Sequence, residues 1–173
     1  MIPSGRQSAK VMLLGDIGVG KTSLAKRLVF DRFEGHYKTT IGVEILTHDI
    51  QLSGACNHET MRLVLWDTDG DFGEAIFSTM YLAGALGALV VADATRPDSF
   101  ARMNGLLQGL ATHLPGRPSA ALVNKIDLID PGLAMPDLAG LRKEELARTS
   151  ALTGEGVMPV FQTMAEAIWR RAR

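Results

Sequence analysis

The sequence has 173 residues and only one cysteine, Cys56, so it cannot form a disulfide within the chain. Folds held together by disulfides are therefore excluded, and a reducing compartment is the expected setting. Lys and Arg number 18 against 19 Asp and Glu, giving a formal net charge of −1. With no excess of either sign, we expect no overall electrostatic attraction to nucleic acid or to an anionic membrane.

Long apolar runs are also missing. The most apolar window, residues 81–94, is interrupted by Gly84 and Gly87 and is shorter than the ~20 residues that a membrane-spanning helix needs. No apolar stretch follows the basic positions near the N-terminus, so no secretory signal is expected. No repeat, low-complexity tract or linker divides the chain. We therefore expect one cytoplasmic domain over residues 1–173.

The sequence does contain short apolar runs that alternate with longer amphipathic segments, a pattern typical of a mostly parallel α/β sheet. Strands are predicted over the apolar runs, at residues 11–14, 41–52, 61–66, 86–92, 119–123 and 148–149. Helices are predicted over the amphipathic segments, at residues 21–30, 97–113, 156–171 and in part 131–145. The second and third strands are separated only by a turn at 54–58, so they can pair antiparallel without a crossover helix.

A glycine-rich motif follows the first predicted strand. Residues 15–22 read Gly-Asp-Ile-Gly-Val-Gly-Lys-Thr and match the G-x-x-x-x-G-K-[ST] pattern of a P-loop. The glycines let backbone N–H groups turn inward around a β-phosphate at a helix N-terminus. Lys21 is expected to reach the β- and γ-phosphates, and Thr22 to offer a hydroxyl to Mg²⁺. A glycine-rich turn that binds nothing is the alternative, disfavoured by the flanking strand and helix.

The choice of base comes from residues 124–127, Asn-Lys-Ile-Asp, directly after a predicted strand. The Asp127 carboxylate can accept hydrogen bonds from both N1–H and the exocyclic amine of guanine, a donor pair that adenine lacks. Asn124 is expected to tie neighbouring loops together, and the stem of Lys125 can lie over the base. On its own this tetrapeptide could equally be a solvated turn, but its position after a P-loop and a buried strand favours guanine recognition.

An acidic motif at residues 66–70, Trp-Asp-Thr-Asp-Gly, ends the third predicted strand. An Asp at this place opposite a P-loop is expected to bind Mg²⁺ directly or through water, so Asp67 is the candidate. The alternative is that Asp67 only caps a turn. The dispersed histidines lack metal-ligand spacing.

Together these motifs closely resemble the Ras-superfamily small GTPases, nearest to the Rab-like branch. The resemblance covers about residues 9–171 and includes Tyr-Lys-Thr-Thr-Ile-Gly at 37–42 and Thr-Ser-Ala-Leu-Thr-Gly-Glu at 149–155. It implies a three-layer P-loop NTPase G domain with a mostly parallel six-stranded sheet and one antiparallel edge strand. It also implies a molecular switch that binds GTP or GDP with Mg²⁺ and meets effectors and regulators through switch I (37–42) and switch II (67–81).

The resemblance assigns roles to residues that spacing alone does not. Thr40 completes the Mg²⁺ shell, Tyr37 closes over the phosphates, Phe33 packs edge-on against guanine, the Gly70 N–H senses the γ-phosphate, and the Ala151 N–H meets the base carbonyl. The expected nucleotide contacts are Asp16, Ile17, Gly18, Val19, Gly20, Lys21, Thr22, Ser23, Phe33, Tyr37, Thr40, Gly70, Asn124, Lys125, Asp127, Ser150, Ala151 and Leu152. The expected metal ligands are Thr22, Thr40 and Asp67, and the expected catalytic group is Lys21, Thr40, Gly70 and Asp71.

Three positions depart from the family pattern. The glutamine that normally orients the attacking water is replaced by Asp71, which is shorter and, when ionised, donates no hydrogen bond. Asp69 adds a second acid beside the γ-phosphate, and the bulk of Ile17 can crowd the water or an incoming arginine. These departures predict slow hydrolysis. The alternative is that Asp71 itself or Glu74 positions the water.

The C-terminal residues, Trp-Arg-Arg-Ala-Arg, lack the cysteines that lipidate Rab-like tails. We expect no stable membrane anchor in this chain, whether because a longer tail was removed or because this is an unlipidated prokaryotic member. The arginines favour the negative end of the last helix, with a weak membrane patch as the alternative. The functional alternatives are a GTP-locked adaptor or nucleotide-stabilised scaffold and, disfavoured by residues 124–127, a P-loop kinase or ATPase.

Overall fold

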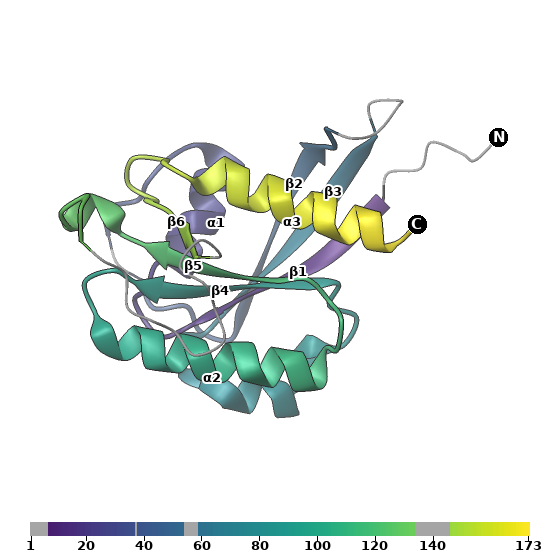
Figure 1. The fold of residues 1–173 in the computed structure, drawn as a ribbon, viewed down its shortest axis with the longest axis horizontal. Coiled ribbons are helices and arrows are strands. Elements are labelled where there is room, and N and C mark those ends of the chain that lie inside the picture. The colour runs from purple at the N-terminus through teal and green to yellow at the C-terminus, as the bar shows by residue number, and fades with distance from the viewer. Residues whose placement is uncertain (1–6, 37, 54–58, 134–145) are drawn as a thin grey trace.

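A computed structural model describes residues 7–36, 38–53, 59–133 and 146–173. Six strands form one sheet in the order β2-β3-β1-β4-β5-β6 (Figure 1). Their bounds are β1 (Gln7–Gly15), β2 (Val43–Gln51), β3 (Thr60–Thr68), β4 (Gly87–Asp93), β5 (Ser119–Asn124) and β6 (Leu146–Arg148). Only β2, at the edge, pairs antiparallel to its neighbour, while the other pairs in this sheet are parallel. The predicted six-stranded sheet with one antiparallel edge strand is confirmed.

Helices cover both faces of the sheet. They are α1 (Lys21–Phe30), α2 (Pro97–His113) and α3 (Val157–Arg171), with 3₁₀ segments η1 (Gly70–Ser78), η2 (Met80–Leu82) and η3 (Ile126–Leu128). Figure 1 shows α1 and α3 on one face and α2 on the other. Alternation along β1 explains this arrangement, because Val11 and Leu13 join the core under α1 and α3, whereas Met12 and Leu14 join the core under α2 and η1.

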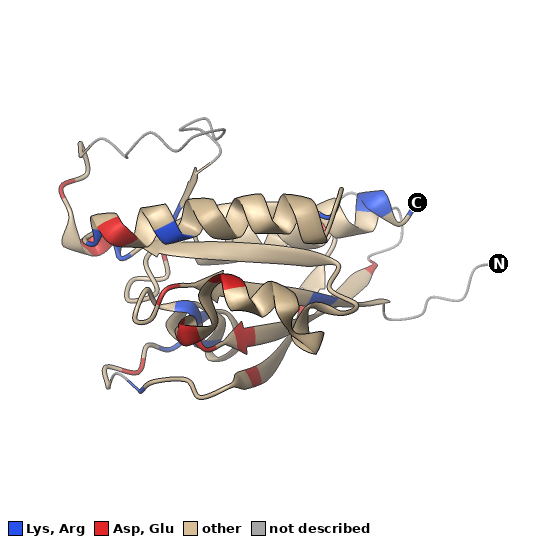
Figure 2. Cartoon of the chain, turned by 90° about the horizontal axis from the view of Figure 1, so that it is seen from below, with Lys and Arg blue, Asp and Glu red and all other residues tan. Residues whose placement is uncertain are grey.

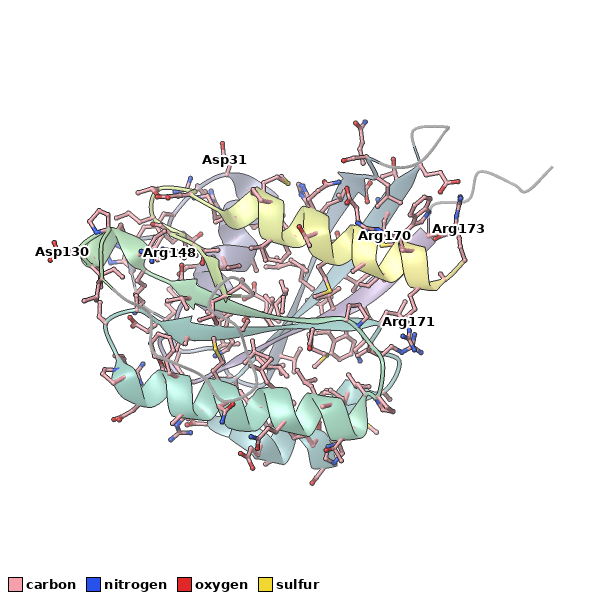
Figure 3. The ribbon with its side chains drawn as sticks, viewed as in Figure 1. Asp31, Asp130, Arg148, Arg170, Arg171 and Arg173 are labelled. Atoms are coloured by element: carbon pink, nitrogen blue, oxygen red, sulfur yellow. The ribbon has the colours of Figure 1, made fainter. Side chains whose placement is uncertain are left out.

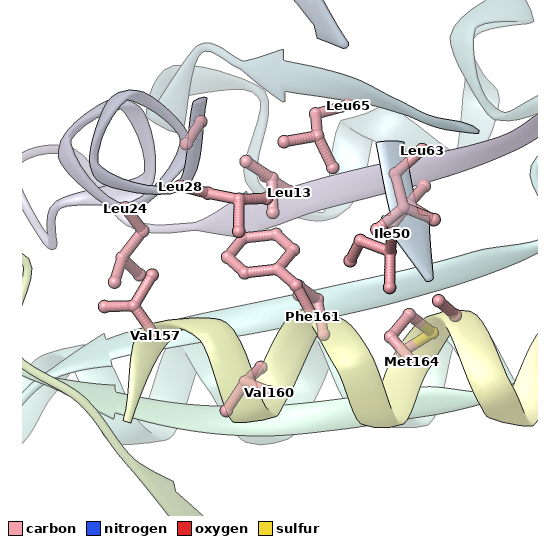
Figure 4. Close-up of a cluster of buried hydrophobic side chains, with 14 of the residues drawn as sticks. Leu13, Leu24, Leu28, Ile50, Leu63, Leu65, Val157, Val160, Phe161 and Met164 are labelled. Atoms are coloured by element: carbon pink, nitrogen blue, oxygen red, sulfur yellow. The ribbon is translucent and has the colours of Figure 1, made fainter. Parts of the chain in front are cut away.

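The larger core lies between the sheet and the pair α1 and α3 (Figure 4). Phe161 of α3 is fully buried and points toward Leu13 of β1 and Leu28 of α1. Val157, at the N-terminal end of α3, lies beside Leu24 of α1. This packing fixes α1, whose first turn follows the P-loop, against the sheet.

Several predicted boundaries need correction. The second strand begins at Val43 instead of residue 41, because Gly42 takes a left-handed conformation with φ +75°. The third extends to Thr68, so Asp67 is a strand residue paired with Glu44. The last strand lies at Leu146–Arg148, and the last helix begins at Val157. The turn at 54–58 and most of the predicted helical stretch, 134–145, lie outside the described residues.

Charges of both signs are interspersed over the described ribbon (Figure 2). Figure 3 shows Arg170, Arg171 and Arg173 at the C-terminal end of α3. Arg170 pairs with Glu166 at 3.1 Å and Arg173 with Glu59 at 2.8 Å. The positive charge in the last helical turn is also favourable toward the helix dipole. Among the described residues, none of the helices combines the length and apolar character that a membrane span needs.

Candidate functional site

A cavity of about 410 Å³ lies where the loops after β1, β3, β5 and β6 meet. This is the carboxyl edge of the parallel strands, where open α/β sheets bind their ligands. Of the residues predicted from sequence, those lining it are Ile17, Gly18, Gly20, Lys21, Thr22, Ser23, Phe33, Thr40, Gly70, Asn124, Lys125, Asp127, Ala151 and Leu152. Tyr37 lies outside the described residues.

The P-loop follows β1 in a conformation that needs glycine. Gly15 has φ +146° and Gly20 has φ +102°, values that L side chains rarely adopt. A Cβ at Gly15 would lie 2.4 Å from the Val91 carbonyl oxygen, and one at Gly20 would lie 2.2 Å from Nδ2 of Asn124. The glycine spacing of the motif therefore reflects both backbone angles and close packing against β4 and the last residue of β5.

Lys21 is buried at the centre of this loop. Its Nζ donates to the carbonyl oxygens of Gly15 and Asp16, each at 2.8 Å. Burial lowers its pKa to about 8, while the carboxylates of Asp67, Asp16 and Asp69 act in the opposite direction. A polyanion bound in the cavity would favour the charged form of Lys21.

Three oxygen-bearing side chains converge beside Lys21. The Thr22 hydroxyl lies 2.8 Å from the Thr40 hydroxyl and donates to Oδ2 of Asp67 at 2.5 Å. Asp67 is fully buried, and its Oδ1 has no hydrogen-bond partner in the described part of the chain. Burial raises its pKa to about 6, although the Thr22 bond and the charge of Lys21 lower it. An unpaired carboxylate oxygen beside two hydroxyls fits Mg²⁺, a hard cation that prefers oxygen ligands.

The opposite end of the cavity is organised by Asn124. Its Nδ2 donates to the Val19 carbonyl at 3.0 Å, and its Oδ1 accepts from the Ala151 N–H at 3.2 Å and the Thr149 hydroxyl at 3.3 Å. Asn124 thus links the P-loop to the loop after β6. Val19 contributes this carbonyl from outside the cavity lining.

Asp127 and Lys125 complete this end. Oδ1 of Asp127 accepts from the Ser150 hydroxyl at 2.5 Å, so Ser150 supports the carboxylate without itself lining the cavity. Nζ of Lys125 donates to the Gly18 carbonyl at 2.7 Å and to Oδ2 of Asp93 at 2.6 Å. The side chain of Lys125 therefore spans the cavity wall between two loops.

Switch II lies against the P-loop. A Cβ at Gly70 would lie 2.4 Å from the backbone nitrogen of Ile17, so these two backbones touch. Asp69 lines the cavity, and its Oδ1 accepts from the Asp71 N–H at 2.9 Å. The Asp71 side chain is exposed and does not line the cavity. Glu74 lines a separate cavity of about 190 Å³ instead.

The structure also places residues that sequence reasoning missed or misjudged. The Asp16 carboxylate points away from the larger cavity and lines the smaller one, where Arg96 pairs with it at 2.7 Å. The loop between α1 and β2 adds Glu34, His36 and Lys38 to the larger cavity. This loop has no periodic pattern, so nothing in the sequence indicated which of its side chains face inward.

The fold and the cavity define a P-loop nucleotide-binding protein. The Ras family model matches residues 10–170. Ras-related protein RABA2a of Arabidopsis thaliana is 35% identical over 166 residues, covering 93% of this chain and 75% of the relative. RGP2 of Oryza sativa subsp. japonica is 34% identical over 168 residues (92% and 74%), and RABF2a of Arabidopsis thaliana is 33% identical over 177 residues (98% and 86%). The chain belongs to the Ras family.

Family membership fixes the general activity. The protein is a small GTPase, a guanine-nucleotide-binding switch that hydrolyses GTP, and its relatives are Rab-like. Ras-like GTPases generally require Mg²⁺ and act through effectors and regulators. The relatives compared come from plants and give no support to the expected prokaryotic origin.

Proposed function

We propose that the larger cavity binds GTP or GDP with Mg²⁺, with the phosphates at the P-loop end. The observation that carries this proposal is the group formed by Thr22, Thr40 and Asp67 beside Lys21, with one buried carboxylate oxygen unpaired. Thr22, Thr40 and Asp67 would hold the metal. A metal held there would supply positive charge to the phosphate oxygens, and Lys21 would add a second positive charge at the same phosphates.

The base end is assigned to Asp127. Its carboxylate lines the cavity and accepts from the Ser150 hydroxyl at Oδ1, and its two oxygens together can accept from the N1–H and the exocyclic amine of guanine. Phe33 and Leu152 are about half exposed and supply apolar surface for the purine. The Ala151 N–H, expected to meet the base carbonyl, donates to Oδ1 of Asn124 at 3.2 Å in the structure, so contact with the base would require this bond to be shared or exchanged.

Calorimetry with GDP and with ADP, each in excess Mg²⁺, tests both assignments. We expect strong binding of GDP and none of ADP at the same concentrations. Equal affinity for the two nucleotides would contradict the role of Asp127, and no heat from GDP would contradict the site as a whole. Chelating Mg²⁺ should weaken GDP binding if Thr22 and Asp67 hold the metal.

We also propose that intrinsic hydrolysis is slow. Asp69 lines the cavity beside the expected γ-phosphate position and accepts from the Asp71 N–H, whereas the Asp71 carboxylate is exposed and lies outside the cavity lining. Ile17 fills the adjacent wall and contacts Gly70. None of the described side chains at this point is a neutral amide that could both accept from and donate to a water molecule, the function that glutamine supplies in related proteins.

Single-turnover hydrolysis of GTP tests this proposal. Asp71→Gln should raise the rate by about 100-fold, the lower end of the range for a positioned catalytic side chain. Asp98→Asn, a matched loss of one carboxylate on α2, should leave the rate unchanged. An unchanged rate in Asp71→Gln, or a wild-type rate at the usual family level, would contradict slow hydrolysis through Asp71.

We assign the binding of effectors and regulators to the surfaces of the two switch segments. Ile41 is 91% exposed and Met80 is 84% exposed, values that are unusual for large apolar side chains and favour a protein partner. Hydrogen exchange of the GDP form and of a form loaded with a non-hydrolysable GTP analogue tests whether residues 38–42 and 67–81 respond to the nucleotide. Equal exchange in both forms would contradict the switch assignment.

A further inference from the structure

Consecutive carbonyl oxygens of the P-loop each accept a hydrogen bond from a side chain, and one of the donors, Arg96, lies outside the lining of the larger cavity. Four side chains donate to five consecutive carbonyls: Lys21 to those of Gly15 and Asp16 (2.8 Å each), Arg96 to that of Ile17 (2.6 Å), Lys125 to that of Gly18 (2.7 Å) and Asn124 to that of Val19 (3.0 Å). Three of the donors belong to the nucleotide motifs of the sequence. The fourth, Arg96, belongs to none of them.

This arrangement determines where the N–H groups point. In a planar trans peptide the C=O and N–H bonds point in opposite directions, and the described residues contain no cis peptide. Holding the Ile17, Gly18 and Val19 carbonyls therefore turns the next three N–H groups, up to that of Gly20, to the other side. Across the described ranges, none of these three N–H groups donates a hydrogen bond within the protein.

Hydrogen bonds hold both the side chain and the backbone of Arg96 in place. Its Nη1 donates to the Ile17 carbonyl and its Nη2 donates to Oδ2 of Asp16 at 2.7 Å, so both arms of the guanidinium are engaged. The backbone of Arg96 is fixed as well, because its N–H donates to the Asp93 carbonyl at 3.0 Å and its own carbonyl accepts from the buried Ser99 hydroxyl at 2.7 Å. A planar fork with two acceptors is a geometry that Arg provides and Lys does not.

We propose that Arg96 is a positioning residue for the nucleotide, which holds the Ile17–Gly18 peptide so that the Gly18 N–H points at the β-phosphate. The inference rests on the proposed binding of the diphosphate by the P-loop and adds a residue from the start of α2. Loss of Arg96 frees that peptide to rotate, so the cavity keeps its base contacts but loses one aligned donor to the phosphate.

A purely structural role is the competing explanation, in which Arg96 only neutralises the buried carboxylate of Asp16. Arg102 separates the two explanations. Its Nε lies 3.4 Å from Oδ1 of the same carboxylate, but it makes no described contact with a P-loop carbonyl. Arg102→Met therefore weakens the charge pairing of Asp16 and leaves the Ile17 carbonyl held by Arg96.

The experiment compares wild type, Arg96→Met and Arg102→Met by competition of GDP and of GMP against a fluorescent guanine nucleotide. Methionine retains an aliphatic stem and removes every donor. GMP lacks the β-phosphate, so it reports on the base end and on general damage to the fold. We expect Arg96→Met to weaken the affinity for GDP about 10-fold, near the effect of one hydrogen bond to a charged group, and to change the affinity for GMP less than 2-fold. Arg102→Met should leave both within 2-fold.

Three results would overturn the assignment: unchanged GDP affinity in Arg96→Met, equal weakening of GDP and GMP, or the same GDP loss in Arg102→Met. Failure of the wild type to bind GDP would instead overturn the proposed site. If Arg96→Met does not fold, Arg96→Lys provides the same comparison, because one ammonium group cannot satisfy both acceptors in the fork geometry. It should then show a smaller selective loss of GDP, and a wild-type ratio of GDP to GMP affinity would overturn the assignment.

Discussion

Two glycines on the same face of α2 meet different side chains of switch II, and substitution of each by alanine should have opposite effects on stability. A Cβ at Gly105 would lie 2.3 Å from Oε1 of Glu74, the end of an exposed and flexible side chain. A Cβ at Gly109 would lie 2.0 Å from Cε2 of Phe77 and close to two further atoms of the ring. Neither glycine has a positive φ, so alanine is sterically allowed by the helix itself.

The magnitudes follow from these contacts. Alanine in place of glycine inside a helix stabilises by about 0.5–1 kcal/mol. At Gly105 the Glu74 carboxylate rotates away at little cost, so most of that gain should remain. At Gly109 the Phe77 ring must move aside and lose its stacking on His113, whose ring centroid lies 4.7 Å away. That aromatic pair contributes about 0.5–1.5 kcal/mol, and the half-buried ring adds about 1 kcal/mol of burial.

Gly109→Ala should therefore be less stable than wild type by about 1 kcal/mol, and less stable than Gly105→Ala by about 2 kcal/mol. For a chain of this size the difference corresponds to a Tm separation of about 4–8 °C. Thermal unfolding of the three proteins at the same saturating GDP and Mg²⁺ concentrations measures it. Equal stability of the two variants would refute the reasoning, because it would mean that displacing the Phe77 ring from α2 does not change the free energy of unfolding.

Three further predictions concern the core, the C-terminal helix and the base. Phe161→Ala should destabilise by about 3–5 kcal/mol in urea unfolding because the ring is fully buried, and a loss below about 1 kcal/mol would contradict its place in the core. Trp169→Phe should cost about 1 kcal/mol by removing the indole N–H bond to Glu59 at 2.7 Å, whereas unchanged stability would show that this bond is replaced by water. Asp127→Asn should weaken GDP binding at least about 100-fold and strengthen the binding of xanthosine diphosphate, whose carbonyl can accept from the amide. An unaltered preference for GDP would exclude Asp127 as the residue that recognises the base.

The sequence alone determined the sheet and the position of the P-loop because both depend on local patterns. The continuous apolar run at residues 11–14 is typical of a strand buried on both faces, and the glycine spacing at 15–20 encodes backbone angles that L residues rarely adopt. The short connection between β2 and β3 predicted their antiparallel pairing, which the register from Val43 to Gln51 confirms. The errors at strand and helix ends arose where Gly42 and Gly156 take left-handed angles that periodicity does not reveal.

Only the tertiary structure decided which side chains act together across long separations. Arg96 reaches the Ile17 carbonyl from 79 positions away, and Asp16 turns toward α2 instead of the larger cavity. Such contacts depend on how α2 packs against the sheet, and they have no period or fixed spacing in the chain. Local patterns specify elements because neighbouring residues share one backbone geometry, whereas the partners within a site are selected by the packing of those elements.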